Sequence, residues 1–191
     1  MLNDREIREA LEAKEIVIDG LADPEKQIQP CSVDLRISGE FLRYDKSIRV
    51  VHLGRPPIMR EGALETFPID ERHHSQGFRL KPGKFALGCT IEKVKLPSHI
   101  MARVEGRSSI GRAGLFVHVT AGFIDPGFEG RITLELFNAS PVPIVVPLGY
   151  RICQLAFERL SGPCERPYGA ARGSKYVGDR AEGVQAAVEE T

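Results

Sequence analysis

The sequence predicts a mainly β protein, built as a closed barrel or as a two-sheet jelly roll. Short runs of apolar or alternating residues recur from residue 16 onward, which is the pattern of half-buried strands. Turn signals separate these runs, the clearest being Lys-Pro-Gly at 81–83, Asp-Pro-Gly at 125–127 and Pro-Leu-Gly at 147–149. Many short strands with glycine and proline between them are typical of barrels and jelly rolls.

One helix is expected before the first strand. Asn3 can cap this helix, and Glu6 lies at the capping-box position three residues later. Apolar side chains then share one helical face as far as Lys14. They are Ile7, Ala10 and Leu11.

The predicted strands cover residues 16–18, 32–37, 40–44, 78–80, 85–94, 100–104, 132–137, 144–146 and 151–157. One stretch breaks the β pattern, the sequence RSSIGRAGL at 107–115. We expect a short helix there, near residues 108–114, with Ser108 or Ser109 as its N-cap.

The chain has 191 residues, a length that suits one domain with a substantial core. We expect a β domain over residues 1–160, with a polar insertion at about 54–76 in which periodicity is weak. Residues 161–191 are rich in glycine, alanine and charge, and they are expected to form a tail that is mobile until something orders it.

The formal net charge is zero, from 26 Lys plus Arg and 26 Asp plus Glu. Sequence-independent binding of a nucleic acid polymer needs a basic surface that displaces phosphate counterions, so we expect no such partner. No apolar run approaches the roughly 20 residues that span a bilayer, and the charged N-terminus does not resemble a signal peptide. We therefore expect a cytoplasmic protein with no membrane partner.

Cysteine and histidine spacing gives little support for a metal held by the protein. The four cysteines contain no C-x-x-C pair, and the five histidines contain no H-x-x-x-H or H-E-x-x-H pair. The cysteines are expected to be small apolar fillers, without a disulfide in a reducing compartment.

Residues 107–112 are the first candidate site. A capping serine leaves free backbone N–H groups at the positive end of a helix, and Arg112 returns to the face of Ser108. Together with Arg107 and Ser109, these side chains can form a phosphate cradle. The alternative is an ordinary N-cap with solvated arginines, which the local pattern alone favours.

Glu135 is the second candidate. The strand period places its carboxylate on the face opposite to three apolar side chains, those of Ile132, Leu134 and Leu136. Such a carboxylate either faces solvent, which spacing alone favours, or lies in a pocket. In a pocket it could move protons near neutral pH, as hydrolysis of an amidine-like C–N bond requires.

The third candidate is the segment AGFIDPGF at 121–128. Small residues before an aromatic and a turn allow close backbone approach, so main-chain groups between Phe123 and Phe128 can contact a planar ligand. Asp125 has the alternative role of starting the turn. His118 is expected to be a structural histidine on a β run.

Taken together, these segments resemble the dCTP deaminase branch of the dUTPase-like trimeric nucleotidohydrolases. RSSIGR at 107–112, HVTAGFIDPGFEG at 118–130 and ITLELFN at 132–138 carry the resemblance. Further matches are QPCSVDLR at 29–36, LKPG at 80–83, RICQL at 151–155, and RPY and SKY in the tail. The set is specific and covers most of the chain outside the insertion, whereas any one piece would be weak.

The resemblance implies a distorted β-barrel or jelly-roll subunit that assembles as a homotrimer, with active sites between subunits. It implies deamination of dCTP without zinc, and the zinc-deaminase pattern of H-x-E followed by P-C-x-x-C is indeed absent. Mg²⁺ is expected on the triphosphate rather than in a protein cage. Inhibition by dTTP is also implied, through movement around His118, Val119 and Thr120.

By the same resemblance, Glu135 is the catalytic group that takes a proton from the water attacking C4. Ser108 positions that water, and Arg112 helps to hold the water and the phosphates. The implied nucleotide-binding residues are Arg107 and Ser109 at the triphosphate, Ala121 at the pyrimidine, Asp125 at the 3'-hydroxyl, Gln154 at a phosphate, and Tyr168 and Lys175 in the closing tail.

Two family activities stay open. Some members stop at dUTP, and others continue to dUMP and pyrophosphate; the run at 121–128 favours the second activity. A plain dUTPase and a non-enzymatic nucleotide-binding module are further alternatives. One departure from the family pattern is Asp179, which stands where a glutamine is usual. A carboxylate beside a triphosphate is repulsive, so either Asp179 points away from the phosphates or the tail closes differently.

Overall fold

The structure is a computed structural model that describes residues 1–44, 49, 64–66, 77–169 and 171. In chain order its elements are α1 (Asp4–Glu12), β1 (Val17–Asp19), α2 (Pro24–Gln27), β2 (Ile28–Gln29), β3 (Ser32–Leu42), β4 (Leu64–Thr66), β5 (Gly77–Leu80), β6 (Phe85–Lys95), β7 (Ile100–Gly106), α3 (Ser108–Arg112), β8 (Leu115–Phe116), β9 (Phe123–Ile124), β10 (Glu129–Asn138), β11 (Ile144–Pro147) and β12 (Arg151–Arg159). Lys175, Asp179 and most of the expected insertion at 54–76 lie outside the described residues.

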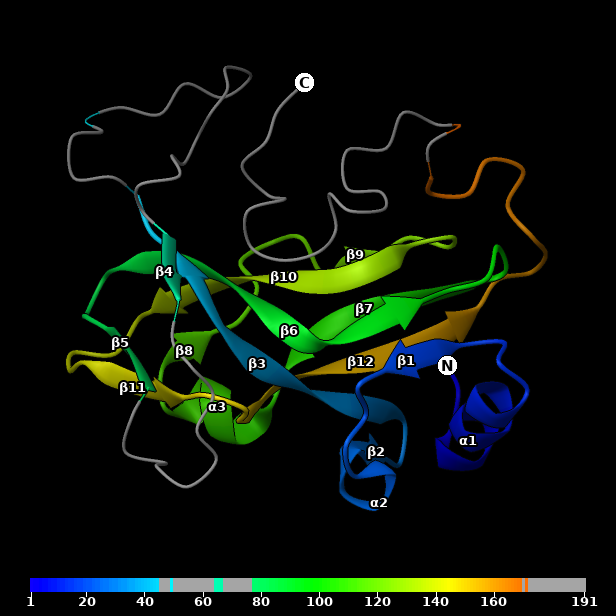
Figure 1. The fold of residues 1–191 in the computed structure, drawn as a ribbon, viewed down its shortest axis with the longest axis horizontal. Helices are drawn as coiled ribbons and strands as arrows, with labels where there is room; N and C mark the ends of the chain where they lie inside the picture. Colours follow the sequence, from blue (N-terminus) through cyan, green and yellow to red (C-terminus); the bar gives the residue numbers. More distant parts are fainter. Residues whose placement is uncertain (45–48, 50–63, 67–76, 170, 172–191) are drawn as a thin grey trace.

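Most strands join one curled antiparallel sheet (Figure 1). Its strand order is β8-β10-β6-β3-β12-β7-β9, with β1 added to β6, and with β2 and β4 added to β3. β5 and β11 form a separate antiparallel pair. The mainly β fold class predicted from the sequence is therefore confirmed.

Strand β3 is the element around which the sheet turns. Its first half pairs with β12, where Val33 lies opposite Leu155, and its second half pairs with β6, where Leu42 lies opposite Leu87. The register shifts in both ladders, and such irregularities bend a strand. The sequence predicted two separate strands here, but one bent strand serves both neighbours.

The core consists of apolar side chains that the long strands bury together. Fully buried members include Leu35, Phe41, Leu134, Leu136, Leu155 and Phe157. Phe41 of β3 stacks on Phe78 of β5 with the ring centroids 3.9 Å apart. Because burying one such ring contributes about 2 kcal/mol, this contact fastens the small sheet to the large one.

Helix α1 begins as the sequence predicts. The Asn3 side chain accepts the Glu6 backbone amide, and the Glu6 carboxylate accepts the Asn3 amide, both at 2.9 Å. Ile7 and Ala10 are buried. The helix ends at Glu12, earlier than expected, because Lys14 adopts a positive φ of 54° that turns the chain towards β1.

An ion-pair cluster fastens the end of α1 to the sheet. The Glu15 carboxylate accepts two hydrogen bonds from Arg159, at 2.7 and 2.8 Å, and lies 2.7 Å from Nε2 of His99. These contacts lower the pKa of Glu15 to about 2, and the hydrogen bond from Arg159 is the largest cause. The cluster joins the residues after α1 to the start of β7 and the end of β12.

Several short elements escaped prediction. Helix α2 has clear start signals, since Asp23 accepts the Lys26 amide at 3.2 Å and Pro24 takes the first helical position. However, four residues are too few for a helical period, and β2, β8 and β9 have only two residues each. None of the helices in the described ranges is long and apolar enough to cross a membrane.

The cysteines differ in their surroundings. All four are free thiols. Cys89 and Cys153 are buried, as expected of apolar fillers, whereas Cys31 is exposed and Cys164 is half-buried. The filler role is therefore wrong for Cys31, because the short β2–β3 turn leaves it at the surface.

Candidate active site

Glu135 lies in the middle of β10 and is half-buried. Leu134 and Leu136 are fully buried on the other face, as the strand period predicts. The Oε2 atom of Glu135 accepts hydrogen bonds from the backbone amides of Val119, at 2.8 Å, and Thr120, at 3.4 Å. The carboxylate is therefore neither fully solvated nor enclosed; it faces the loop that follows β8.

That loop is held against β7 at its other end. The carbonyl of Gly122 accepts the Val104 amide at 2.7 Å. A Cβ atom on Gly122 would lie 3.3 Å from the Val104 oxygen and 3.4 Å from the His118 ring, so the close approach leaves room only for glycine without displacement. Ala121, the residue implied at the pyrimidine, is exposed in the same loop.

The β run expected at His118 is wrong. Strand β8 pairs with β10 over only two residues, so the chain has left the sheet before His118. Its Nδ1 atom is buried and has no hydrogen-bond partner within the described residues. His118 is thus a loop residue beside Gly122, with an unsatisfied polar atom, rather than a satisfied histidine in a sheet.

Helix α3 exposes the side chains of Ser108, Ser109 and Arg112. The expected serine cap is wrong: Arg107 keeps an extended backbone, and its carbonyl accepts the first amides of the helix, which makes it the N-cap. Within the described part of the chain, none of the three exposed side chains makes a hydrogen bond or an ion pair. They are available to a molecule outside this chain.

The guanidinium of Arg107 is paired with a buried carboxylate. Asp34 of β3 has a side chain only 2% exposed, and its Oδ2 lies 3.1 Å from Nε of Arg107 and 3.2 Å from Nη1 of Arg151. Arg107 also donates from Nη1 to the carbonyl of Arg151 at 2.8 Å. Burial raises the pKa of Asp34, and the two guanidinium groups oppose that shift.

Gln154 supports the same corner of the fold from β12. Its side chain accepts the Ser32 hydroxyl at 3.1 Å and donates to the carbonyl of Gly106 at 3.3 Å. Asp34 is the partner of Gln154 across the β3–β12 ladder. Asp34 was not predicted as a site residue. A carboxylate within the predicted strand at 32–37 is the sequence feature that could have identified it.

The turn after β9 receives the start of the tail. The Asp125 carbonyl accepts the Phe128 amide at 3.1 Å, so Asp125 does begin the turn, and its side chain is exposed. Tyr168 donates its backbone amide to the Pro126 carbonyl at 2.8 Å, and its ring lies 5.9 Å from that of Phe128. Gly127 has a φ of 87°, and a Cβ atom there would lie 2.7 Å from the Tyr168 oxygen.

The fold gathers the candidate residues that are described, all but Lys175, into three groups rather than one. The groups are Glu135 with the loop of His118, Val119, Thr120 and Ala121; Arg107 and Gln154 with the exposed residues of α3; and Asp125 with Tyr168. No hydrogen bond or ion pair between described residues joins Ser108 or Arg112 to Glu135. Strand β8 connects the first two groups, because it leads from α3 to a pairing with β10.

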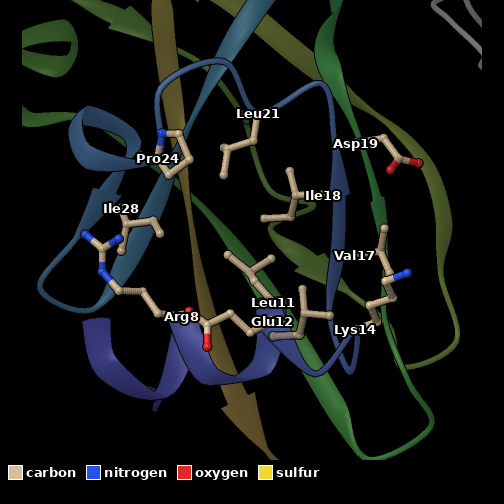
Figure 2. Close-up of a pocket in the computed structure, with 11 residues that line it drawn as sticks. Arg8, Leu11, Glu12, Lys14, Val17, Ile18, Asp19, Leu21, Pro24 and Ile28 are labelled. Carbon is tan, nitrogen blue, oxygen red and sulfur yellow. The ribbon is translucent and has the colours of Figure 1, made fainter.

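A cavity of about 540 Å³ lies elsewhere, between α1, β1 and α2 (Figure 2). Its apolar lining comes from Leu11, Ile16, Val17, Ile18, Leu21, Pro24 and Ile28, and its polar lining from Arg8, Glu12, Lys14 and Asp19. None of the candidate residues that the structure describes lines it, so the cavity is separate from the described part of the candidate site.

The chain is similar to a known protein family and to several of its members. A protein-family model described as dCTP deaminase-like matches residues 1–160. The dUMP-forming dCTP deaminase of Dictyoglomus thermophilum is 48% identical over 178 residues, which cover 92% of this chain and 89% of that protein. The dCTP deaminase of Natronomonas pharaonis is 47% identical over 181 residues, which cover 93% of this chain and 90% of that protein.

Two solved structures share the fold. The 2'-deoxycytidine 5'-triphosphate deaminase from Agrobacterium tumefaciens has a TM-score of 0.62 at 26% identity, covering 83% of this chain and 47% of that one. This chain therefore spans about half the length of that protein. The EIAV dUTPase has a TM-score of 0.50 at 17% identity, covering 80% and 95% of the two chains. The dUTPase-like fold predicted from the sequence is confirmed.

Proposed function

The chain belongs to the dCTP deaminase-like family, and from that premise we propose that it deaminates dCTP to dUTP and ammonia. We propose further that the same site hydrolyses dUTP to dUMP and pyrophosphate. The observation that carries this proposal is the 48% identity, over 92% of the chain, to a protein named a dUMP-forming dCTP deaminase. The alternative is a deaminase that stops at dUTP, because a relative with 47% identity is named dCTP deaminase alone.

Glu135 is the proton carrier in the proposed deamination. Its Oε2 atom is occupied by the loop amides, and its Oε1 atom makes no hydrogen bond within the described residues. Oε1 takes a proton from water as the water oxygen attacks C4 of cytosine, and the proton passes to N3. The remaining hydroxyl proton passes to the 4-amino group, which leaves as ammonia, so that water and dCTP give dUTP.

Ser108 and Arg112 are assigned to the attacking water and the phosphates. Since neither side chain is bonded to Glu135 within the described residues, we propose that a second copy completes the site in a homotrimer. Large apolar side chains are exposed around the loop that Glu135 contacts, as is typical of surfaces covered on assembly. They include Phe116, Val119 and Phe123, which are 54%, 51% and 68% exposed.

The remaining assignments follow the order of groups on the nucleotide. We assign Ala121 to the pyrimidine, Asp125 to the 3'-hydroxyl, Arg107, Ser109 and Gln154 to the phosphates, and Tyr168 and Lys175 to the closing tail. The contact of Tyr168 with the Asp125–Phe128 turn supports a tail that starts beside the sugar site. Inhibition by dTTP through His118, Val119 and Thr120, and a cytoplasmic location, belong to the same proposal.

Mg²⁺ is proposed to bind through the triphosphate, with no zinc. The residues near the start of α3 agree with this proposal. The buried carboxylate there, Asp34, is already paired with two guanidinium groups, so this part of the site suits an anion rather than a metal ion. Mg²⁺ prefers phosphate oxygens and keeps several waters. When bound, it would neutralise phosphate charge; removing it with EDTA is expected to weaken dCTP turnover.

The test is to incubate the pure protein with dCTP and Mg²⁺ and to measure ammonia, dUTP, dUMP and pyrophosphate over time. Ammonia released together with dUMP and pyrophosphate supports the full proposal. Accumulation of dUTP with ammonia rejects the second step, and the absence of ammonia rejects deamination. Sedimentation equilibrium distinguishes a trimer from the 21.1 kDa single chain.

A further inference from the structure

The buried carboxylate of Asp34 contacts Arg107, one of the residues assigned to the triphosphate. It comes from β3, whereas its two cationic partners come from the start of α3 and the start of β12. One oxygen, Oδ2, lies within 3.2 Å of a nitrogen of each guanidinium. A charge removed from water in this way is tolerated only when it is paired, so all three side chains hold one another in place.

The pairing also decides which edge of Arg107 is free. A guanidinium has five N–H donors in a rigid plane. Nε is ion-paired with Asp34, and Nη1 donates to the Arg151 carbonyl, so Nη2 is left without a hydrogen bond within the described residues. The side chain is 22% exposed. Asp34 therefore holds the guanidinium of Arg107, next to Ser108 in the chain, while its Nη2 donors stay uncommitted.

We propose that Asp34 is a positioning residue that sets the preference for a triphosphate, by holding Arg107 in the orientation that binds phosphate oxygens. This inference rests on the proposed function, since it needs a nucleotide phosphate at Arg107. Without the carboxylate, two neighbouring cations repel each other, and Arg107 loses the ion pair that holds its Nε edge. The base and sugar contacts do not depend on that edge.

A second buried carboxylate provides a matched control. Glu92 is fully buried and accepts Nε of Arg36 at 2.7 Å, and Arg36 lies two residues from Asp34 in the same strand. Neither member of this pair belongs to the candidate site. The variants Asp34→Asn and Glu92→Gln therefore remove the same kind of buried charge, but only the first lies behind Arg107.

The experiment measures the Kd of dCTP and of dCMP, with Mg²⁺, by calorimetry. Each variant is made in the Glu135→Gln background so that dCTP is not consumed. Asp34→Asn is expected to lower the dCTP preference over dCMP by about tenfold or more, the worth of a charge-assisted hydrogen bond, with dCMP affinity nearly unchanged. Glu92→Gln is expected to leave the preference unchanged. Equal losses for both nucleotides, or equal effects of both variants, overturn the proposal.

A double-mutant cycle with Arg107→Gln tests whether Asp34 acts through Arg107. In that background Asp34→Asn is expected to change the dCTP preference no further, whereas independent effects would add. If Asp34→Asn does not fold, Asp34→Glu replaces it, because the longer side chain displaces the carboxylate while keeping its charge. An unchanged preference in the folded Asp34→Glu variant also overturns the proposal.

The outcomes separate the two proposals. If the wild-type protein releases no ammonia from dCTP, or if the Glu135→Gln protein binds dCMP as tightly as dCTP, the proposed function fails. If the wild-type protein deaminates dCTP and the Glu135→Gln protein prefers the triphosphate, but that preference is intact when Asp34→Asn is added, the role of Asp34 alone is overturned.

Discussion

The Oε2 atom of Glu135 and the backbone nitrogen of Val119 lie 2.8 Å apart. This hydrogen bond joins the middle of β10 to the loop that continues from β8 to β9. The carboxylate assigned to proton transfer therefore also holds the loop that carries Ala121. Removing its charge and removing its hydrogen-bond acceptor are expected to have different consequences.

The first prediction separates these two roles with Glu135→Gln. Glutamine keeps a carbonyl oxygen that can accept the Val119 amide but cannot carry a proton, so ammonia release should fall by about 100-fold or more while the fold persists. Glu129→Gln is the control, because Glu129 lies in the same strand with its carboxylate paired to Lys95 at 2.8 Å. Unfolding of Glu135→Gln, or retained ammonia release, would contradict the assignment.

The second prediction concerns Ser108→Ala. Removing a capping serine costs about 1 kcal/mol of stability, but Arg107 is the N-cap and the Ser108 hydroxyl makes no bond within the described residues. Thermal denaturation should therefore leave the midpoint unchanged, while kcat for ammonia release falls because water is no longer positioned. A lowered thermal midpoint with an unchanged kcat would show instead that Ser108 caps the helix and does not position water.

The third prediction is a pH dependence of stability at Glu15. Its pKa is lowered from 4.5 to about 2 in the folded protein, so its contacts stabilise the fold above pH 4.5 and lose that contribution as the pH falls towards 2. Glu15→Gln should reduce the free energy of unfolding at pH 7 by about 1–2 kcal/mol. The effect is no larger because water screens a partly exposed charged pair.

Urea titrations between pH 7 and pH 3 check this dependence, since the difference between the wild type and Glu15→Gln should narrow towards pH 3. The matched control is Glu25→Gln. Glu25 pairs with Arg8 at 2.9 Å, but its side chain is 81% exposed, so its loss should leave stability unchanged. A difference at Glu15 that stays constant with pH would exclude the ion pairs as its cause.

The fourth prediction concerns the anchor of the tail. Gly127→Ala places a side chain at a φ of 87° and 2.7 Å from the Tyr168 oxygen, so it should cost about 1–3 kcal/mol and displace Tyr168. Limited proteolysis should then cut faster near residue 168. Gly162→Ala should have no effect, because among the described residues no atom beyond its chain neighbours lies within 4 Å of a Cβ there. Equal cutting of both variants would show that the turn does not anchor the tail.

The local sequence pattern was sufficient to predict those helices and strands in which buried residues recur at a regular spacing. The capping box at Asn3, a short helix near 108–114 (observed at Ser108–Arg112) and the inward face of β10 were predicted, because each depends on neighbours within a few residues. The face of Glu135 followed in the same way. A period of two or of 3.6 residues is written in the sequence wherever one side of an element is buried.

Tertiary structure alone decided what those side chains meet. Asp34, Arg107 and Arg151 come from three distant segments, and only the register of β3 with β12, and of β12 with β7, brings them together. The loop position of His118 follows from how soon β8 leaves β10. Strand order and register join residues far apart in the chain, so the sequence could identify Glu135 and Arg107 as candidates, whereas their partners depended on the folded sheet.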